Sequence, residues 1–455
     1  MGDFNVKNMS SPAELRNFTQ HLLKDIQALE MMLEKGWFET DPIRIGAEQE
    51  LCLVDRNWKP APLNLEILEK ANNPSLTNEL ARFNLEINLL PKIFRGSCFS
   101  DLEKELDENL KKLRKVTSGF DANVIFTGIL PSIRKFDVEM DNITPFDRYY
   151  ALMESIKKLR GDQYDLKMRG IDELNIKLDS ALIEACNTGF QVHLQVTPDE
   201  FVRKYNIAQA ISAPVLGIAV NSPMLFGKRL WKESRIALFQ QSIDTRSSSE
   251  HLRDRSPRVM FGNHWADGSI LDIYREDIVR FRVLLGANFE QDSMEMVENG
   301  QVPKLKALTV HNSTVYRWNR PCYGVSDNGK PHLRIENRIL PSGPSIPDEI
   351  ANAAFWLGLM NGFGDVYQDV TKMIDFDSVR SNFFITANHG LQSNITWLKN
   401  KPISVRELIK KELLPIAREG LAKKNVNKKD IDLYLGIIEE RNRKNTTGSN
   451  WMLDS

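Results

Sequence analysis

The stretch HLRIENRILPSGPS, from His332 to Ser345, decides how this chain is interpreted. If it forms a β-strand, its side chains alternate between two faces. The apolar face carries Leu333, Ile335 and Ile339, and the charged face carries Arg334, Glu336 and Arg338. Charged groups are rarely buried without partners, so such a row predicts a site for a metal, a phosphate or a carboxylate. The alternative is an exposed sheet face with a cross-strand ion pair.

Three other segments repeat this half-apolar pattern: RIGAEQELCLVD from Arg44, ARFNLEINLLP from Ala81 and FQVHLQV from Phe190. Their polar faces carry Glu48, Glu50, Glu86, Gln191 and His193. A strand that merely faces solvent would favour Thr, Lys and Ser. If all four strands share one antiparallel sheet, their polar faces line a single cleft.

Several carboxylates in one cleft repel each other by several kcal/mol at an effective dielectric of about 20. The cleft therefore requires a cation. Oxygen ligands with one imidazole suit Mg²⁺ or Mn²⁺. The arginines would suit an anionic partner, such as a triphosphate or a substrate carboxylate. The chain has no GxxxxGK phosphate loop and no Ser/His/Asp or Cys/His arrangement.

Composition favours a globular protein in the cytoplasm. The chain has 455 residues, of which 42% are hydrophobic and 27% charged, and a net charge of −1, which argues against nucleic-acid and membrane partners. Its four cysteines form no CxxC pair and are expected to be free thiols in a reducing compartment. We expect neither a signal peptide nor a bilayer-spanning run.

The rest of the chain is expected to surround the sheet. Ser11, Pro12 and Glu14 form a capping box with proline at the first helical position, which predicts a helix to about residue 35. Further helices are expected over 101–117, 178–188, 206–220, 346–367, 405–425 and 429–441. Further strands are expected from Asn123 and from Thr309, and residues 134–175 are expected to form loops and helical pieces. The Ser/Arg-rich segment 244–270 predicts a mobile loop or lid. We predict a catalytic domain over 1–375 and a helical part of the same unit over 376–455.

The motifs also resemble a known family over nearly the whole chain. They are GAEQE from Gly46, FNLEINLLP from Phe83, FQVHLQV from Phe190, NSPMLFG from Asn221 followed by Arg235, VYRWNRP from Val315, HLRIENRILPSG from His332 and TTGSNW from Thr446. In this order they resemble the glutamate–cysteine ligase superfamily, specifically its bacterial carboxylate–amine ligase branch.

The resemblance implies an α+β, glutamine-synthetase-like fold, in which a large antiparallel sheet forms a funnel with helices packed outside. It implies an enzyme that uses ATP and Mg²⁺ or Mn²⁺ to form a γ-glutamyl-type amide through an acyl phosphate, as in glutathione biosynthesis. The expected metal ligands are Glu48, Glu50, Glu79, Glu86, His193 and Glu336. Arg338 and Glu336 are expected to be catalytic, and Gln191, Arg235, Arg320 and Arg334 to bind ATP or substrate.

Two other functions stay open on the sequence alone. Guanidino kinases share a similar catalytic sheet, so a phosphotransferase is one alternative; a non-catalytic sensor of ATP or amino acids is the other. Retention of the expected metal ligands argues against the sensor. The expected partners are small molecules, namely ATP, an amino-acid carboxylate and an amine. The oligomeric state stays open, with a homodimer as one expectation.

Overall fold

The computed structural model describes residues 6–9, 11–161, 164–246 and 257–455. At its centre lies an eight-stranded sheet in which every pairing is antiparallel. Six strands follow one path in the order β15 (Asn319–Val325), β16 (Pro331–Asn337), β9 (Phe190–Val196), β2 (Arg44–Val54), β4 (Asn84–Asn88) and β3 (Leu76–Asn78). The short strands β5 (Lys92–Ile93) and β6 (Asn123–Ile125) pair with the two ends of β2.

One face of this sheet belongs to the hydrophobic core. Leu51, Val192 and Ile335 point to this face and are buried. Helices α5 (Phe201–Ala219) and α11 (Ile346–Val366) lie against it, and both are apolar nearly all round, as befits helices covered on every side. Each fully buried aliphatic side chain contributes about 1.5–3 kcal/mol, so this face fixes the sheet firmly.

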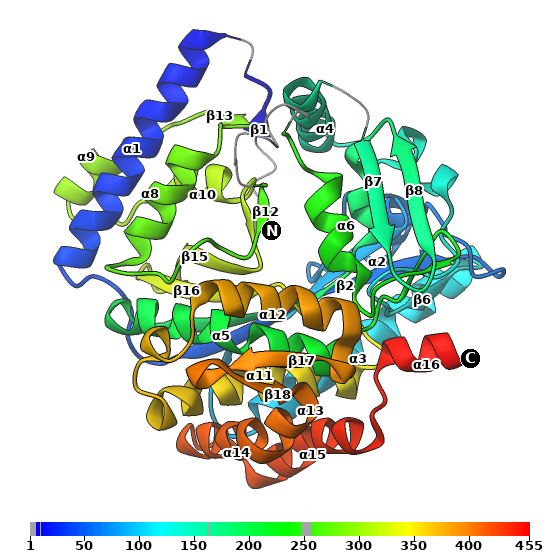
Figure 1. The fold of residues 1–455 in the computed structure, drawn as a ribbon. Coiled ribbons are helices and arrows are strands. Elements are labelled where there is room, and N and C mark those ends of the chain that lie inside the picture. The colour runs from blue at the N-terminus through cyan, green and yellow to red at the C-terminus, as the bar shows by residue number, and fades with distance from the viewer. Residues whose placement is uncertain (1–5, 10, 162–163, 247–256) are drawn as a thin grey trace.

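Behind α11 lies a second helical layer, seen at the bottom of Figure 1. It contains α3 (Cys98–Thr117), α14 (Leu414–Lys423) and α15 (Lys428–Lys444). A β-carbon on Gly358 of α11 would lie 2.6 Å from the carbonyl oxygen of Ala417, and one on Gly420 would collide with the Gly358 carbonyl oxygen. Glycines at these positions let α11 and α14 pack backbone against backbone.

Other helices rise on the opposite side of the sheet, in two groups (Figure 1). One wall holds α1 (Pro12–Glu34), α8 (Ile270–Arg280), α9 (Ser293–Glu298) and α10 (Lys306–Asn312). The other holds α4 (Asp147–Arg160), α6 (Ser234–Ser242) and the hairpin of β7 (Tyr164–Arg169) and β8 (Glu173–Leu178). The polar face therefore forms the floor between two helical walls.

The remaining α-helices and strand pairs of the described residues lie outside the central sheet. The helices are α2 (Asn64–Ala71), α12 (Phe376–His389), α13 (Val405–Leu408) and α16 (Gly448–Asp454). The strand pairs are β1 (Val6–Lys7) with β13 (Gly286–Ala287), β10 (Met224–Leu225) with β11 (Lys228–Arg229), β12 (Val259–Met260) with β14 (Tyr316–Arg317), and β17 (Asn394–Trp397) with β18 (Lys401–Ser404). None of the described helices is both long and apolar enough to cross a bilayer.

Strand β15 forms one edge of the sheet, since β16 is its only neighbour on the described strand path. Pro321 lies near the start of this strand. Its carbonyl oxygen accepts hydrogen bonds from the Tyr274 hydroxyl at 3.1 Å and from Asn312 Nδ2 at 2.9 Å. The edge is thus tied to α8 and α10 rather than left open.

The four half-polar strands and the capping box at Ser11 are confirmed. The strand predicted from Thr309 is wrong at its start, because Lys306–Asn312 is a helix and β14 begins only at Tyr316. The reason is a distant contact: the buried Asp25 carboxylate accepts the backbone N–H of Leu308 in the first turn of that helix. A partner 283 residues away leaves no trace in the local pattern.

Other boundaries also differ from the prediction. The helix expected over 178–188 is a 3₁₀ segment over Ala181–Cys186, and the helix expected from residue 206 begins at Phe201. The segment 134–175 holds α4 and the first strand of a hairpin, where alternating residues such as Leu166 and Met168 are buried. Of the predicted lid, residues 247–256 lie outside the described residues. The division at residue 375 stays a prediction.

The close packing of α11 and α14 gives a stability prediction. Gly420→Ala should lower the free energy of unfolding by about 2 kcal/mol, because its new β-carbon meets rigid backbone. Gly436→Ala in α15 is the matched control, since a β-carbon there meets nothing within 4 Å. It should be neutral or stabilise the protein by about 0.5–1 kcal/mol. Urea unfolding of both variants is the measurement, and equal stabilities would contradict this packing.

Candidate active site

Strand register brings most of the predicted residues together on one face. Three cross-strand rows carry seven of them: Arg320–Glu336–His193, Gln191–Glu48–Asn88 and Glu50–Glu86–Thr77. Side chains directly opposite on neighbouring antiparallel strands have β-carbons about 4.5–5.5 Å apart. The rows therefore place groups up to 290 residues apart in sequence within one site, counted from Glu48 on β2 to Arg338 just beyond β16.

An acidic cluster lies toward the β3 side of the sheet. Glu50, Glu79 and Glu86 each offer a carboxylate oxygen, and these atoms lie within 4.8 Å of one another. Burial and the neighbouring acids raise the pKa of Glu79 well above its ordinary value. Burial and Glu48 raise the pKa of Glu86 to about 8. The cluster therefore resists carrying three negative charges unless a cation joins it.

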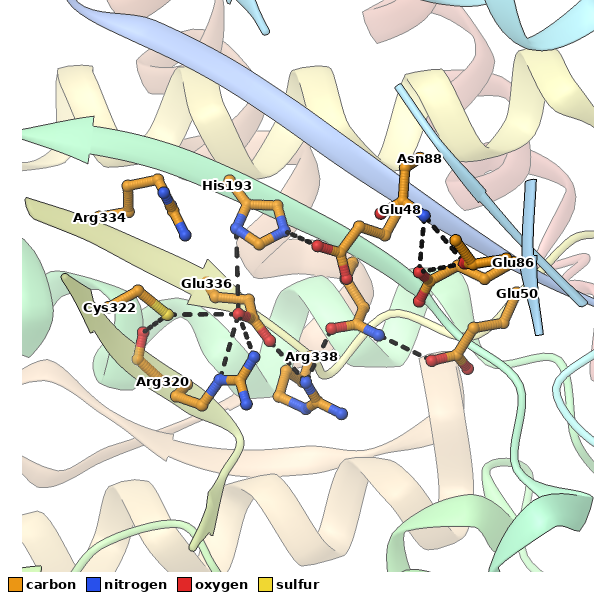
Figure 2. A network of polar contacts seen from close by, with 12 residues as sticks. Glu48, Glu50, Glu86, Asn88, His193, Arg320, Cys322, Arg334, Glu336 and Arg338 are labelled. Atoms are coloured by element: carbon orange, nitrogen blue, oxygen red, sulfur yellow. Dashed lines mark hydrogen bonds and ion pairs between the residues drawn. The ribbon is translucent and has the colours of Figure 1, made fainter. Parts of the chain in front are cut away.

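A second cluster combines acids with histidine. His193 Nε2 lies 3.2 Å from Glu48 Oε1, and His193 Nδ1 lies 3.9 Å from Glu336 Oε2 (Figure 2). Both ring nitrogens are buried, and neither makes a hydrogen bond of regular geometry within the described chain. Buried polar atoms are normally satisfied, so Nδ1, which has only the Glu336 oxygen at 3.9 Å, leaves room for a further partner.

Glu336 also binds two arginines. Its carboxylate accepts from Arg320 Nη2 at 2.7 Å and from Arg338 Nη1 at 2.6 Å. Burial alone would raise the pKa of Glu336, but Arg320, Arg338 and His193 hold it well below its ordinary value. This carboxylate is therefore ionised at neutral pH.

Gln191 joins the two clusters. Its Oε1 accepts from Arg338 Nη1 at 2.8 Å, and its Nε2 donates to Glu50 Oε1 at 2.7 Å. Glu50 is also fixed by the backbone N–H of Gly189, at 2.6 Å. The amide thus links the acidic cluster and the Arg338 guanidinium into one network.

Three hollows run along this face, and Glu48 lines all of them. One of about 150 Å³ contains the acidic cluster and Arg338. One of about 90 Å³ contains His193, Glu336 and Arg320. One of about 720 Å³ extends from His193 to Arg44, Gly46 and Asn328, and Arg334 lines both this hollow and the second. The site is therefore an elongated cleft with room for more than one ligand.

Arg235 is the one predicted binding residue that lies behind the cleft rather than along it. It is buried on α6, where its Nε donates to Glu233 at 2.7 Å and its Nη2 donates to the carbonyl oxygen of Ile339 at 2.6 Å. Its charge helps to oppose the rise in pKa that burial causes at Glu50. Its predicted contact with substrate stays a prediction.

Sequence reasoning missed several residues that line the hollow around the acidic cluster. They are Arg148 and Tyr149 on α4, Glu184 in the 3₁₀ segment and Tyr316 on β14. Burial and Glu50 raise the pKa of Glu184 to about 7. One signal was available, because Glu184 is a lone acid in the otherwise apolar run ALIEAC. Arg148 lies in a stretch of mixed charged residues, where no sequence signal marks it.

Carboxylates and arginines that converge on one face of an antiparallel sheet form a site of the kind that suits a polyphosphate together with a carboxylate. The family comparison makes this specific. A family model described as Glutamate-cysteine ligase family 2 (GCS2) matches residues 44–360, and the chain belongs to this family. It is therefore an ATP-dependent ligase.

Two solved structures share its fold. Glutamate–cysteine ligase from Francisella tularensis, in complex with AMP, has a TM-score of 0.55 and 14% identity, covering 92% of this chain and 85% of that one. A bifunctional glutathione synthetase from Pasteurella multocida has a TM-score of 0.52 and 10% identity, covering 95% of this chain but 51% of that one. This chain thus spans about half of the Pasteurella enzyme. Comparison with curated proteins gave no match.

The raised pKa of Glu86 predicts a pH effect on stability in metal-free protein. Its folded-state value of about 8 exceeds the ordinary carboxyl value, so the folded protein holds a proton that the unfolded chain releases. The contribution of Glu86 to the free energy of unfolding is therefore greatest at low pH and is lost as the pH rises to about 8.

Glu86→Gln should remove that loss. Between about pH 5 and about pH 8, the variant should lose less unfolding free energy than wild type, by on the order of a few kcal/mol. Urea unfolding in EDTA at both pH values measures this. The exposed Glu69→Gln serves as control and should follow wild type. Identical slopes for all three proteins would contradict the buried, protonated Glu86.

Proposed function

We propose that the protein joins a glutamate side-chain carboxylate to an amine, with an acyl phosphate as intermediate and cysteine as the leading candidate for the amine. The observation that carries this proposal is the continuous network from Glu50 through Gln191 and Arg338 to Glu336. It sets a phosphate-binding guanidinium beside two groups of cation ligands. Family membership and the AMP in the Francisella ligase structure support the use of ATP.

Mg²⁺ or Mn²⁺ fits the residues present. Glu50, Glu79 and Glu86 would hold one cation, because their oxygens converge and the raised pKa values of Glu79 and Glu86 reflect the cost of leaving their charges uncompensated. Glu48, His193 and Glu336 would hold another, bound by one ring nitrogen of the buried imidazole. When bound, such ions neutralise the β- and γ-phosphates of ATP.

In the first step, a carboxylate oxygen of the substrate attacks the γ-phosphorus and ADP leaves. Arg338 would stabilise the charge that spreads over the transferring phosphoryl oxygens. Glu336 and Gln191 hold its guanidinium in place, so little reorganisation is needed during the reaction. Arg320 is fixed by the same carboxylate and would assist from the other side.

In the second step, the amine attacks the acyl carbonyl and phosphate leaves. In total a carboxylate, an ammonium and ATP give an amide, ADP, phosphate and one proton. The chain needs no covalent nucleophile for this. The acyl phosphate must be shielded from water, and the helical walls of α4 and α10 over the polar floor would provide that shielding.

The proposal favours a ligase over the two alternatives. A phosphotransferase would release a stable phosphorylated product, and a sensor would bind ligands without turnover; family membership favours neither. We further propose that the fold is glutamine-synthetase-like, with the sheet as a funnel, and that the protein is cytoplasmic, forms a homodimer and has no nucleic-acid partner. Cysteine as the amine would make the product the dipeptide that enters glutathione biosynthesis.

A substrate screen tests the proposal. Purified protein with MgATP and glutamate is mixed with single amino acids and other amines. ADP release is followed, and the products are identified by mass spectrometry. We expect ADP release that depends on the amine, together with an amide product. Glu336→Gln should abolish both while the chain stays folded by circular dichroism. A stable phosphorylated product, or full activity in Glu336→Gln, would overturn the proposal.

Arg338→Ala should separate catalysis from binding. Because the guanidinium is expected to act mainly in the transition state, kcat should fall about 100-fold or more while the KM for ATP changes only a few-fold. Arg380→Ala on the surface of α12 is the control and should change neither constant. Steady-state kinetics measure both. A rise in KM for ATP at unchanged kcat would refute the assigned role.

A further inference from the structure

The Arg334 side chain is oriented by a hydrogen bond to a histidine rather than to a carboxylate. Its Nη1 lies 2.7 Å from His332 Nε2, and within the described chain this imidazole is the only hydrogen-bond partner of the guanidinium. Its Nε is buried and has no partner among the described residues. The side chain lies beside His193, and no dashed line joins it to the other residues drawn in Figure 2. It is thus oriented by one contact and otherwise left available.

Other arginines on this face are paired with carboxylates. Arg44, Arg320 and Arg338 each form an ion pair with a carboxylate. Arg334 instead contacts an imidazole. Its positive charge is therefore left uncompensated by the carboxylates of the described chain, which favours an anionic ligand.

Hydrogen-bond chemistry fixes the state of His332. Arginine only donates, so His332 Nε2 must be the acceptor and the ring must be neutral. Nδ1 then carries the proton and donates to the Ser326 hydroxyl, 3.0 Å away. Burial and Arg334 lower the pKa of His332 to about 4, which agrees with a neutral ring.

The chain of hydrogen bonds ends at the buried carboxylate of Glu39. The Ser326 hydroxyl donates onward to Glu39 Oε2 at 3.1 Å. The buried Glu39 carboxylate also accepts from Asn328 at 2.9 Å and from Gln195 at 3.1 Å, and pairs with Arg44. Burial works against its ionisation, but these donors lower its pKa to about 2. Every bond from Arg334 to Glu39 therefore has a defined direction.

The neighbouring edge strand makes room for this contact. Gly324 is the cross-strand partner of His332. A β-carbon at Gly324 would lie 2.7 Å from His332 Nε2 and 2.8 Å from Arg334 Nη1, the two atoms of the hydrogen bond. Any larger residue at position 324 would therefore push the His332 and Arg334 side chains apart. This is a second observation, independent of the hydrogen bonds, that the contact is built into the fold.

We propose that the chain Glu39–Ser326–His332 positions Arg334 to bind phosphate oxygens of the nucleotide, with Gly324 leaving the space that this requires. His332 is then a positioning residue of the ligase reaction. The inference rests on the proposed function, because it takes ATP as the ligand. The hollow of about 720 Å³ that Arg334 lines has the size of a small-molecule binding site, which is large enough for a nucleoside triphosphate.

Two substitutions of His332 separate positioning from mere packing. Glutamine places an amide oxygen near the position of Nε2 and can still accept from Arg334. Asparagine reaches only the position of Nδ1, so it keeps the contact with Ser326 and loses the contact with Arg334. We expect His332→Asn to bind MgATP about tenfold more weakly, and His332→Gln to stay near wild type.

Calorimetric titration with MgATP measures affinity directly, and steady-state kinetics give the matching constants. In His332→Asn the KM for ATP should rise about tenfold, with kcat and the KM for the amino-acid substrates little changed. Gly324→Ala should resemble His332→Asn. Equal affinities for the Asn and Gln variants, or a rise confined to the KM of the carboxylate substrate, would overturn the inference.

A double-mutant cycle tests whether His332 acts through Arg334. Arg334→Met should weaken MgATP binding, and adding His332→Asn to it should cost nothing further. Full additivity would overturn the positioning role. The two proposals can be rejected independently. If wild-type protein shows no amine-dependent ADP release, the ligase reaction is rejected. MgATP titration of the variants still decides the role of His332.

Discussion

The structure depends on the electrostatic cost of gathering acidic side chains on one buried sheet face. Glu48, Glu50, Glu79, Glu86 and Glu336 all lie along a single cleft. Like charges at these separations repel by several kcal/mol even at an effective dielectric of about 20. Three compensations are visible: raised pKa values in the acidic cluster, arginine pairs at Glu336, and an arrangement of oxygens that suits cations. Ligand binding and protein stability are thus coupled at this face.

A sheet is well suited to hold such a cluster. Register fixes which residues oppose each other, and the far face is packed against two apolar helices, so both oppose backbone shifts that would separate the carboxylates. Loops would let the carboxylates drift apart and would lose the arrangement that cations require. The walls complete the site, because α4 and α10 bring further side chains over the floor.

Much of this floor could be predicted from the sequence, because alternation in a strand is a local signal. That alternation alone indicates Glu48, Glu86, His193 and Glu336, and the family resemblance adds Glu79. The walls could not be predicted in the same way. Helix α10 depends on a carboxylate from α1, and Glu184 reaches the cleft through the path of a 3₁₀ segment. Long-range contacts of this kind override local preference and leave no periodic pattern.

The covered edge of the sheet has a consequence for the behaviour of the protein in crowded solution. Exposed edge strands invite pairing with strands of other molecules, and the catalytic sheet would be inactivated by such growth. At Pro321 the chain has no N–H to offer, and its carbonyl oxygen is already engaged by Tyr274 and Asn312. Intermolecular β-pairing at this point would have to break both bonds and would gain no donor, so Pro321 disfavours growth of the sheet at this edge.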